Sequence, residues 1–209
     1  AGPLLDAGCG TGGLLAKLGR AKPDGQRFGL DYDAGAAARA AAKSGAAVAS
    51  GSINALPFAD ASFAAVVSAD VLCHAAVEPA AALAELRRVL RPGGRLVLNM
   101  PAYQWLLSTH DRRVHNTRRV TAGQLRGWLA AAGFTAIRTQ YWNSLLLPLM
   151  VAQRKLLAAH AGAASDVAAP PRWLDALFAA VVGLERRLHL RLPAGGSVLY
   201  QVEANGAGS

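Results

Sequence analysis

A run of ten residues close to the start of the chain, LLDAGCGTGG from Leu4 to Gly13, constrains the fold most strongly. An apolar strand, an acid and closely spaced glycines stand here directly before a helical stretch. Glycine permits positive φ and lets backbone amides approach a ligand closely, while a helix N-terminus adds a dipole that favours negative groups. The run therefore predicts a ligand-binding turn between the first strand and the first helix of an α/β sheet.

Strand-length apolar runs alternate with helical stretches through the first two thirds of the chain, which is the pattern of βαβ units and a parallel sheet. One helix is expected to end at the turn Arg91–Gly94, and another is expected to be capped by Thr121. The expected strands are Pro3–Ala7, Arg27–Asp31, Ala46–Ala49, Ala64–Ser68, Arg95–Met100 and Phe134–Tyr141, and the clearest helices are Ala80–Leu90 and Ala122–Ala132.

The pattern changes after this part of the chain. Between Leu145 and Leu190 two apolar, arginine-edged helical stretches flank a linker at Gly162–Pro171, and Ser197–Glu203 is a final strand-like run. A helical excursion that returns to the sheet predicts that the last two strands pair antiparallel. We therefore expect an α/β fold: a Rossmann-like, doubly wound, mostly parallel sheet with an antiparallel last strand and a helical cap inserted before it.

The length of 209 residues fits one domain. We expect a cofactor-binding half at 1–100, a substrate-facing half at 101–141, a helical insertion at 142–192, and the last strand and tail at 193–209. A strand begins almost at the first residue and no initiator Met precedes it, so N-terminal elements are expected to be missing.

Composition and charge narrow the partners. The chain is 53% hydrophobic and 17% charged, which is globular rather than disordered, and its net charge of +9 favours an anionic partner. The sequence argues against nucleic acid as a partner because no Lys/Arg run is interleaved with aromatics. No signal peptide and no apolar run of about 18 residues is found. The two cysteines suit neither a disulfide framework nor a metal site, so we expect a cytoplasmic protein, with peripheral contact to the inner face of the membrane as an option.

The glycine run allows two ligands. Gly8, Gly10 and Gly13 satisfy the pattern G-x-G-x-x-G of nicotinamide dinucleotide sites. Asp6 stands two residues before the first glycine, where a carboxylate would repel a pyrophosphate but can bind an ammonium group such as that of methionine. The acid therefore favours the second kind of ligand.

Asp6 with Gly8, Gly10 and Gly12 resembles the first motif of the class I S-adenosylmethionine-dependent methyltransferases. The resemblance runs from about Leu4 to Tyr141, with Gly195–Glu203 fitting the last strand, and includes GLDYD and LRRVLRPGGRLVLNMP. It implies S-adenosylmethionine as cofactor and the small-molecule branch, here with a C-terminal helical insertion.

The resemblance also implies residue roles. Asp31 would accept hydrogen bonds from both ribose hydroxyls, and Tyr32 would pack beside the adenine. The sequence departs from the family at Ser52, where an acid is usual, at Ala64, where aspartate is common, and at Cys73, where glutamate is common. The expected cofactor-binding residues are Asp6, Gly8, Cys9, Gly10, Gly12, Asp31, Tyr32, Ser52, Ile53, Ala69 and His74.

The segment PAYQWLLSTHDRRVHNTRRVT, from Pro101 to Thr121, follows the fifth strand and should face the substrate, because ligands of open α/β sheets bind beyond the carboxyl ends of the strands. His110 or His115 is a candidate base that Asp111 could orient. The candidate substrate-binding residues are Tyr103, Arg118 and Arg119, where the arginines would grip an anionic acceptor. The alternative is a structural loop held by Asp–Arg pairs and helix caps, and no metal site is indicated.

These observations favour S-adenosylmethionine-dependent methyl transfer to a small-molecule or lipid-linked, optionally anionic acceptor, with no obligate protein partner. One alternative is a non-catalytic subunit that binds the cofactor, and a weaker one is a nicotinamide-dependent oxidoreductase. The apolar insertion is either core packing or a lid over an apolar or lipid-linked acceptor.

Overall fold

The computed structural model describes residues 2–152, 172–188 and 192–204, without the side chains of His110, Arg186 and residues 172–175. In this part of the chain a seven-stranded sheet has the order β3-β2-β1-β4-β5-β7-β6. Its strands are β1 (Leu4–Ala7), β2 (Arg27–Asp31), β3 (Ala47–Ser50), β4 (Phe63–Ala69), β5 (Leu90–Pro101), β6 (Phe134–Trp142) and β7 (Ser197–Ala204).

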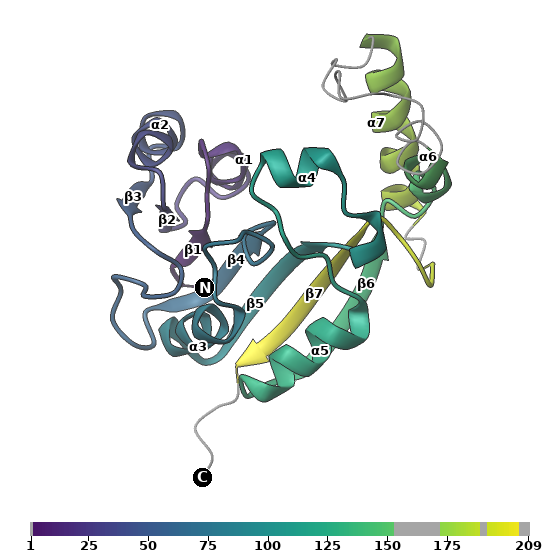
Figure 1. The fold of residues 1–209 in the computed structure, drawn as a ribbon. Coiled ribbons are helices and arrows are strands. Elements are labelled where there is room, and N and C mark those ends of the chain that lie inside the picture. Colours follow the sequence, from purple (N-terminus) through teal and green to yellow (C-terminus); the bar gives the residue numbers. More distant parts are fainter. Residues whose placement is uncertain (1, 153–171, 189–191, 205–209) are drawn as a thin grey trace.

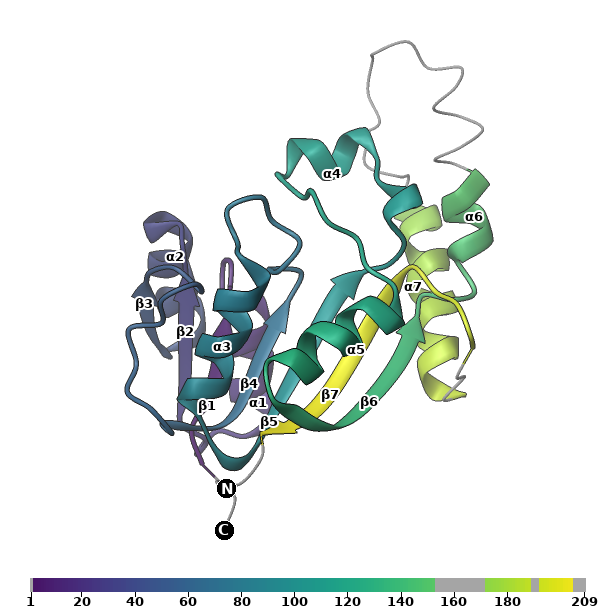
Figure 2. The same ribbon diagram turned by 60° about the horizontal axis from the view of Figure 1, so that its bottom comes forward.

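Helices cover both faces of the sheet (Figure 2). The helices α1 and α2 contact each other on one face, and α3 and α5 contact each other on the opposite face. Three further helices lie beyond the end to which the parallel strands run, with α6 and α7 side by side next to β6 and β7 (Figure 1). The helices are α1 (Gly13–Ala21), α2 (Ala34–Ser44), α3 (Pro79–Val89), α4 (Thr109–Arg113), α5 (Ala122–Ala131), α6 (Leu147–Ala152) and α7 (Arg172–Arg187), with a short 3-10 turn at Gln104–Leu106.

Strand directions follow the prediction. The strands β1 to β5 pair in parallel, while β7 is inserted antiparallel between β5 and β6. The Rossmann-like α/β fold with an antiparallel last strand is therefore confirmed. The chain order reverses between β1 and β4, and open α/β sheets bind ligands at such a switch point.

Local signals explain where several helices begin and end. The Asp33 side chain caps α2 by accepting a hydrogen bond from the Ala36 amide at 2.6 Å. Thr121 caps α5, as predicted, and forms a capping box with Gln124. Gly45 ends α2 with a φ of 66°, in the left-handed region that favours glycine.

Some boundaries differ from the prediction. The helix expected at Ala80–Leu90 ends at Val89 because Leu90 pairs with Phe63 of β4, so the Arg91–Gly94 turn is part of the irregular start of β5. The short helix α4 and the 3-10 turn were not predicted. The expected linker at Gly162–Pro171 lies outside the described residues. No helix in the described part is both long and apolar enough to cross a membrane.

Candidate cofactor and acceptor site

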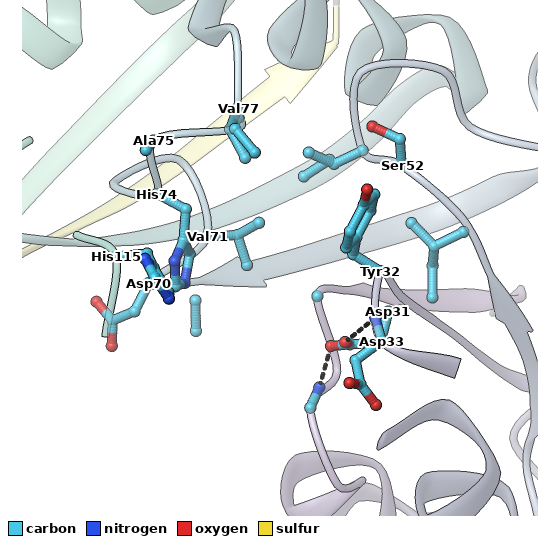
Figure 3. A pocket seen from close by; sticks show the side chains of 16 residues that line it. Asp31, Tyr32, Asp33, Ser52, Asp70, Val71, His74, Ala75, Val77 and His115 are labelled. Atoms are coloured by element: carbon cyan, nitrogen blue, oxygen red, sulfur yellow. Dashed lines mark hydrogen bonds between the residues drawn. The ribbon is translucent and has the colours of Figure 1, made fainter. Parts of the chain in front are cut away.

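A cavity of about 660 Å³ opens at the carboxyl ends of β1, β2 and β4, within the ~300–1,000 Å³ usual for ligand pockets. It lies at the switch point of the sheet, and Figure 3 shows its side chains in two groups facing each other. Its lining residues are Gly8, Gly10, Leu30, Asp31, Tyr32, Asp33, Ser52, Ile53, Ala69, Asp70, Val71, His74, Ala75, Ala76, Val77 and His115.

The glycine loop forms the floor next to β2. The amides of Gly8 and Cys9 both donate to the Leu30 carbonyl, at 2.7 and 2.9 Å. Gly8 has a φ of 91°, and a Cβ atom there would lie 2.1 Å from Cγ2 of Val71. Gly10 has a φ of 53° and open space where a Cβ would stand. The loop therefore requires glycine at Gly8 for close packing, and at Gly10 it leaves room beside the cavity.

Asp31 lies at the end of β2 and holds two backbone turns. Its Oδ2 accepts from the Gly10 amide at 2.7 Å, and its Oδ1 accepts from the Asp33 amide at 3.0 Å. Next to it the Tyr32 ring projects into the cavity (Figure 3) and is 81% exposed. An exposed aromatic ring beside a fixed carboxylate suits a ligand with a flat base and a sugar.

The wall beyond Tyr32 is carried by the loop after β3, which contains Ser52 and the buried Ile53. Asn54 ties this loop to the segment after β4, since its Nδ2 donates to the Ala76 carbonyl and its Oδ1 accepts from the Glu78 amide, both at 3.0 Å. Sequence reasoning missed Asn54, because an asparagine in a loop carries no local signal of a tertiary role.

Asp6 is buried behind the glycine loop, with 2% exposure, and does not line the cavity. Its Oδ2 has no hydrogen-bond partner among the described residues. Burial, and then the nearby Asp31 carboxylate, raise the pKa of Asp6 from 3.8 to about 6. A buried carboxylate oxygen without a partner fits a cationic group bound beyond the loop.

This raised pKa gives a stability prediction. The folded protein holds the Asp6 proton more tightly than the unfolded chain, so the stabilising effect of that proton is lost as pH rises from about 4 to about 6. Above pH 6 the charged carboxylate costs about 3 kcal/mol. We expect Asp6→Asn to be more stable than the wild type at pH 7.5 without ligand, and the two to converge near pH 4, measured by urea denaturation across this range. Parallel pH curves would contradict the assignment.

Cys9 and Gly12 also lie outside the lining. Cys9 is buried below the loop, and Gly12 is the N-cap residue before α1, with a φ of 77°. A Cβ at Gly12 would lie 2.7 Å from Cα of Ala40, so this glycine serves helix packing between α1 and α2. The predicted cofactor residues that do line the cavity are Gly8, Gly10, Asp31, Tyr32, Ser52, Ile53, Ala69 and His74.

Opposite Asp31 and Tyr32, the side chains of Asp70, His74 and His115 are grouped on one wall (Figure 3). The segment after β5 is joined to the segment after β4 by backbone hydrogen bonds, including Ala75 N to the His115 carbonyl at 3.0 Å and Thr117 N to the Cys73 carbonyl at 2.9 Å. This pairing brings His115 to the cavity. Sequence reasoning missed Asp70, although its place directly after β4 was a signal.

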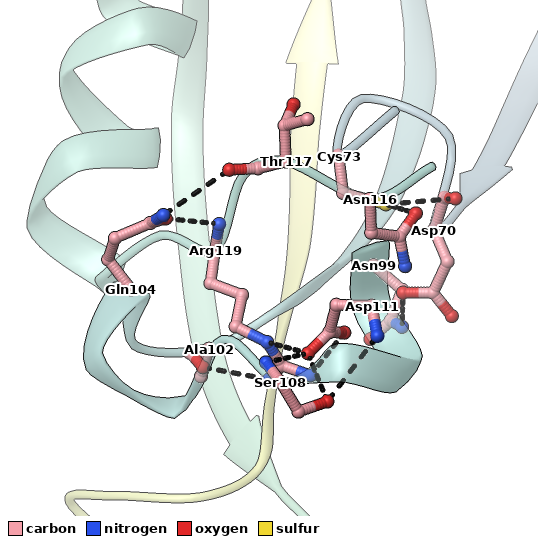
Figure 4. A network of polar contacts seen from close by, with 10 residues as sticks. All are labelled: Asp70, Cys73, Asn99, Ala102, Gln104, Ser108, Asp111, Asn116, Thr117 and Arg119. Carbon is pink, nitrogen blue, oxygen red and sulfur yellow. Dashed lines mark hydrogen bonds and ion pairs between the residues drawn. The ribbon is translucent and has the colours of Figure 1, made fainter. Parts of the chain in front are cut away.

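The predicted arginines make contacts inside the protein. Arg119 pairs with Asp111, with Nη2 2.7 Å from Oδ1, and the two side chains are only 4% and 3% exposed (Figure 4). Burial alone would raise the pKa of Asp111, but hydrogen bonds from Arg119 and Ser108 outweigh it and lower the pKa to about 2. Arg118 donates from Nη1 to the His74 carbonyl at 2.6 Å. Such contacts are those expected of a structural loop held by Asp–Arg pairs, which was the alternative to substrate binding. Neither arginine lines the cavity.

Two other predicted residues lie elsewhere. Tyr103 stacks on Tyr141, with ring centroids 5.6 Å apart and planes 11° apart, and does not line the cavity. Burial and Tyr141 raise the pKa of Tyr103 to about 12. His110 lies in α4, and its side chain is outside the described residues.

Comparisons with known proteins agree with this geometry. Residues 5–98 match the family model described as a methyltransferase domain. The malonyl-[acyl-carrier protein] O-methyltransferase of Dechloromonas aromatica is 34% identical over 142 residues, which cover 64% of this chain and 52% of that protein. The chain spans about half the length of the curated relatives it matches.

Solved structures share the fold. The geranyl diphosphate C-methyltransferase of Streptomyces coelicolor, solved with S-adenosyl-L-homocysteine, has a TM-score of 0.64 at 17% identity, covering 98% of this chain and 73% of that one. The [4+2]-cyclase SpnF has a TM-score of 0.65 at 25% identity, covering 99% and 76%.

The sheet with its inserted antiparallel β7 and the glycine-loop cavity define a class I methyltransferase fold. Residues 5–98 carry a methyltransferase domain, and the described chain has the fold of the S-adenosylmethionine-dependent methyltransferases. The match to this domain argues against the nicotinamide-dependent alternative. The cofactor is S-adenosylmethionine, and the buried Asp6 oxygen, the open space at Gly10 and the exposed Tyr32 ring all fit it.

Proposed function

We propose that the protein transfers the methyl group of S-adenosylmethionine to an oxygen or nitrogen of a small-molecule acceptor bound against Asp70, His74 and His115. The observation that carries this proposal is the single cavity that joins the glycine loop and Asp31 to this polar wall. The names of the relatives point to different acceptors, so the proposed acceptor class rests on the residues that line the cavity.

The cofactor half of the cavity would be held by the residues already described. Asp31 would accept from the ribose hydroxyls with the lone pairs that its two backbone contacts leave free. Tyr32 and Ile53 would enclose the adenine, and the loop from Gly8 to Gly10 would lie against the methionine part. Asp6 would stabilise its ammonium group through the loop.

Replacing Asp31 with alanine tests the first of these roles. We expect the affinity for S-adenosylhomocysteine to fall by about 1–3 kcal/mol, since two hydrogen bonds to the ribose are lost and each contributes a net of about 0.5–1.5 kcal/mol. Calorimetric titration measures it, with Asp24→Asn as control because Asp24 is exposed in the turn before β2 and outside the cavity.

A matched ligand separates ribose binding from loop support. The 2′-deoxy analogue should bind the wild type more weakly than S-adenosylhomocysteine does, and the variant should show little of this difference. If the loss caused by the 2′-deoxy analogue and the loss caused by Asp31→Ala add fully, Asp31 does not contact this hydroxyl and acts only by holding the Gly10 amide.

When bound, the cofactor supplies an electrophilic methyl: the acceptor's oxygen or nitrogen bonds the methyl carbon while sulfur keeps the electron pair of the broken bond. The protein has to align the acceptor with that methyl and to remove the acceptor's proton. The imidazole of His115 would take this proton. His74 would form the part of the wall next to His115. Its backbone is held in place by the hydrogen bond from Arg118 to its carbonyl.

A lipid-linked acceptor is a second candidate for the same reaction, favoured by apolar side chains exposed on and near α6 and α7. These are Trp142, Leu145, Leu149, Leu177, Leu184 and Leu188, which are 37% to 57% exposed. Peripheral contact with a membrane stays a prediction of the sequence.

The proposal is tested by incubating the protein with methyl-labelled S-adenosylmethionine and a cell extract separated into lipid and aqueous pools. Labelled product in the aqueous pool supports the small-molecule acceptor, and label in the lipid pool supports the lipid-linked one. Tight cofactor binding without transfer to any pool would indicate the non-catalytic subunit instead.

A further inference from the structure

Asp70 is placed on the acceptor wall by contacts that hold its backbone and one side-chain oxygen. It follows β4 directly, and its amide donates to the Asn99 carbonyl of β5 at 3.0 Å. Its φ is 56°, a left-handed conformation that aspartate and asparagine tolerate better than other residues with a side chain. The Asn99 Nδ2 donates to Oδ1 of Asp70 at 2.9 Å (Figure 4).

The second oxygen of this carboxylate is available to a ligand. Among the described residues none donates a hydrogen bond to Oδ2 of Asp70, and the side chain is solvent-exposed in the cavity wall. The side chain of Asn99 is neutral, so its hydrogen bond to Oδ1 orients the Asp70 carboxylate but does not cancel a charge on it. Asp70 therefore offers a fixed acceptor oxygen on the wall with His74 and His115.

The charges of the lining restrict what can bind there. Its carboxylates are Asp31, Asp33 and Asp70, and no Lys or Arg is found among the lining residues that the structure describes. Arg118 and Arg119, which follow His115 in the chain, are engaged with the His74 carbonyl and with Asp111 respectively. Arg112 and Arg113, which precede His115, are exposed and lie outside the lining. The chain has a net charge of +9, but its basic side chains are therefore not found among the residues that line this cavity.

We propose that Asp70 recognises the methyl acceptor, with Oδ2 accepting a hydrogen bond from an amine or hydroxyl group of the acceptor. The site then selects acceptors that are cationic or neutral at this end and rejects carboxylates and phosphates. This inference rests on the proposed methyl transfer, and it replaces the anionic acceptor that net charge alone favoured.

The test separates a deproteinised small-molecule extract by ion exchange into cationic, neutral and anionic pools. Each pool is incubated with labelled S-adenosylmethionine and the wild type, Asp70→Asn or the control Asp24→Asn. Asparagine keeps the left-handed backbone and removes the charge, and unchanged affinity for S-adenosylhomocysteine verifies that each variant is folded. We expect label from the cationic or neutral pool, reduced at least thirtyfold by Asp70→Asn and unchanged by Asp24→Asn.

A binding measurement distinguishes recognition from chemistry. The compound purified from the active pool is titrated into protein loaded with S-adenosylhomocysteine, where no transfer can occur. Asp70→Asn should weaken its binding at least tenfold. Label confined to the anionic pool, or equal binding by variant and wild type, would overturn the role of Asp70 while leaving methyl transfer intact. Absence of label from every pool would overturn the proposed function together with this inference.

Discussion

Replacing Arg119 with methionine is expected to lower the free energy of unfolding by about 3–5 kcal/mol, because the change leaves the Asp111 charge buried without its counterion. The pair is closed by two contacts, Nη2 to Oδ1 at 2.7 Å and Nε to Oδ2 at 3.2 Å, and Arg119 also donates to the Ala102 carbonyl at 3.2 Å. Methionine keeps most of the side-chain volume. The melting temperature should fall by on the order of 10 °C for a domain of this size.

The same segment supplies the control. Arg113→Met removes an equal charge from an exposed position in α4 and should change stability by less than about 0.5 kcal/mol. The double variant Arg119→Met/Asp111→Asn should recover much of the loss, since the unpaired charge is then gone. In the wild type the lowered pKa of Asp111 makes the contribution of the pair fade only as pH falls from about 4 to about 2. Equal melting temperatures for Arg119→Met and Arg113→Met would refute a stabilising pair.

Sequence reasoning located the elements whose signals are local. The bounds of β2 were predicted as Arg27–Asp31, and the Thr121 cap of α5 was predicted from a single residue type at a helix start. The end of α3 was missed because it depends on Leu90 pairing with Phe63, a contact between segments distant in sequence. Local patterns therefore predict that an element exists better than they predict where tertiary contacts end it.

The residues in and around the cavity also divide into those predicted from local signals and those placed by tertiary contacts. Gly8, Gly10 and Asp31 were found because they stand at strand ends, where an α/β sheet binds ligands. The arginines were assigned to the substrate because a sequence does not reveal whether a guanidinium points into a cavity or closes an internal pair. Only the structure shows that Arg119 forms a buried ion pair with Asp111.

The largest effect on catalysis is expected from His115→Asn. His115 is the candidate base that lines the cavity, and its position is set by the hydrogen bond from the Ala75 amide to its carbonyl at 3.0 Å. Its φ of 59° is tolerated by asparagine, so the substitution removes the imidazole while keeping the backbone. A positioned general base contributes about 10²–10⁴-fold to a rate, so kcat should fall by this factor when the acceptor loses a proton during transfer.

The split between kinetic parameters decides whether His115 acts on the proton or on binding. We expect kcat to fall while the affinity for S-adenosylhomocysteine and for the acceptor stays close to that of the wild type, measured by calorimetry and single-turnover transfer. Val114→Ala, an exposed neighbour outside the cavity, is the control and should leave kcat unchanged. A loss of acceptor affinity with an unchanged kcat would make His115 a binding residue, because uniform binding alters KM without altering the chemical step. An unchanged kcat and KM would remove it from the mechanism and leave alignment of the acceptor as the main source of catalysis.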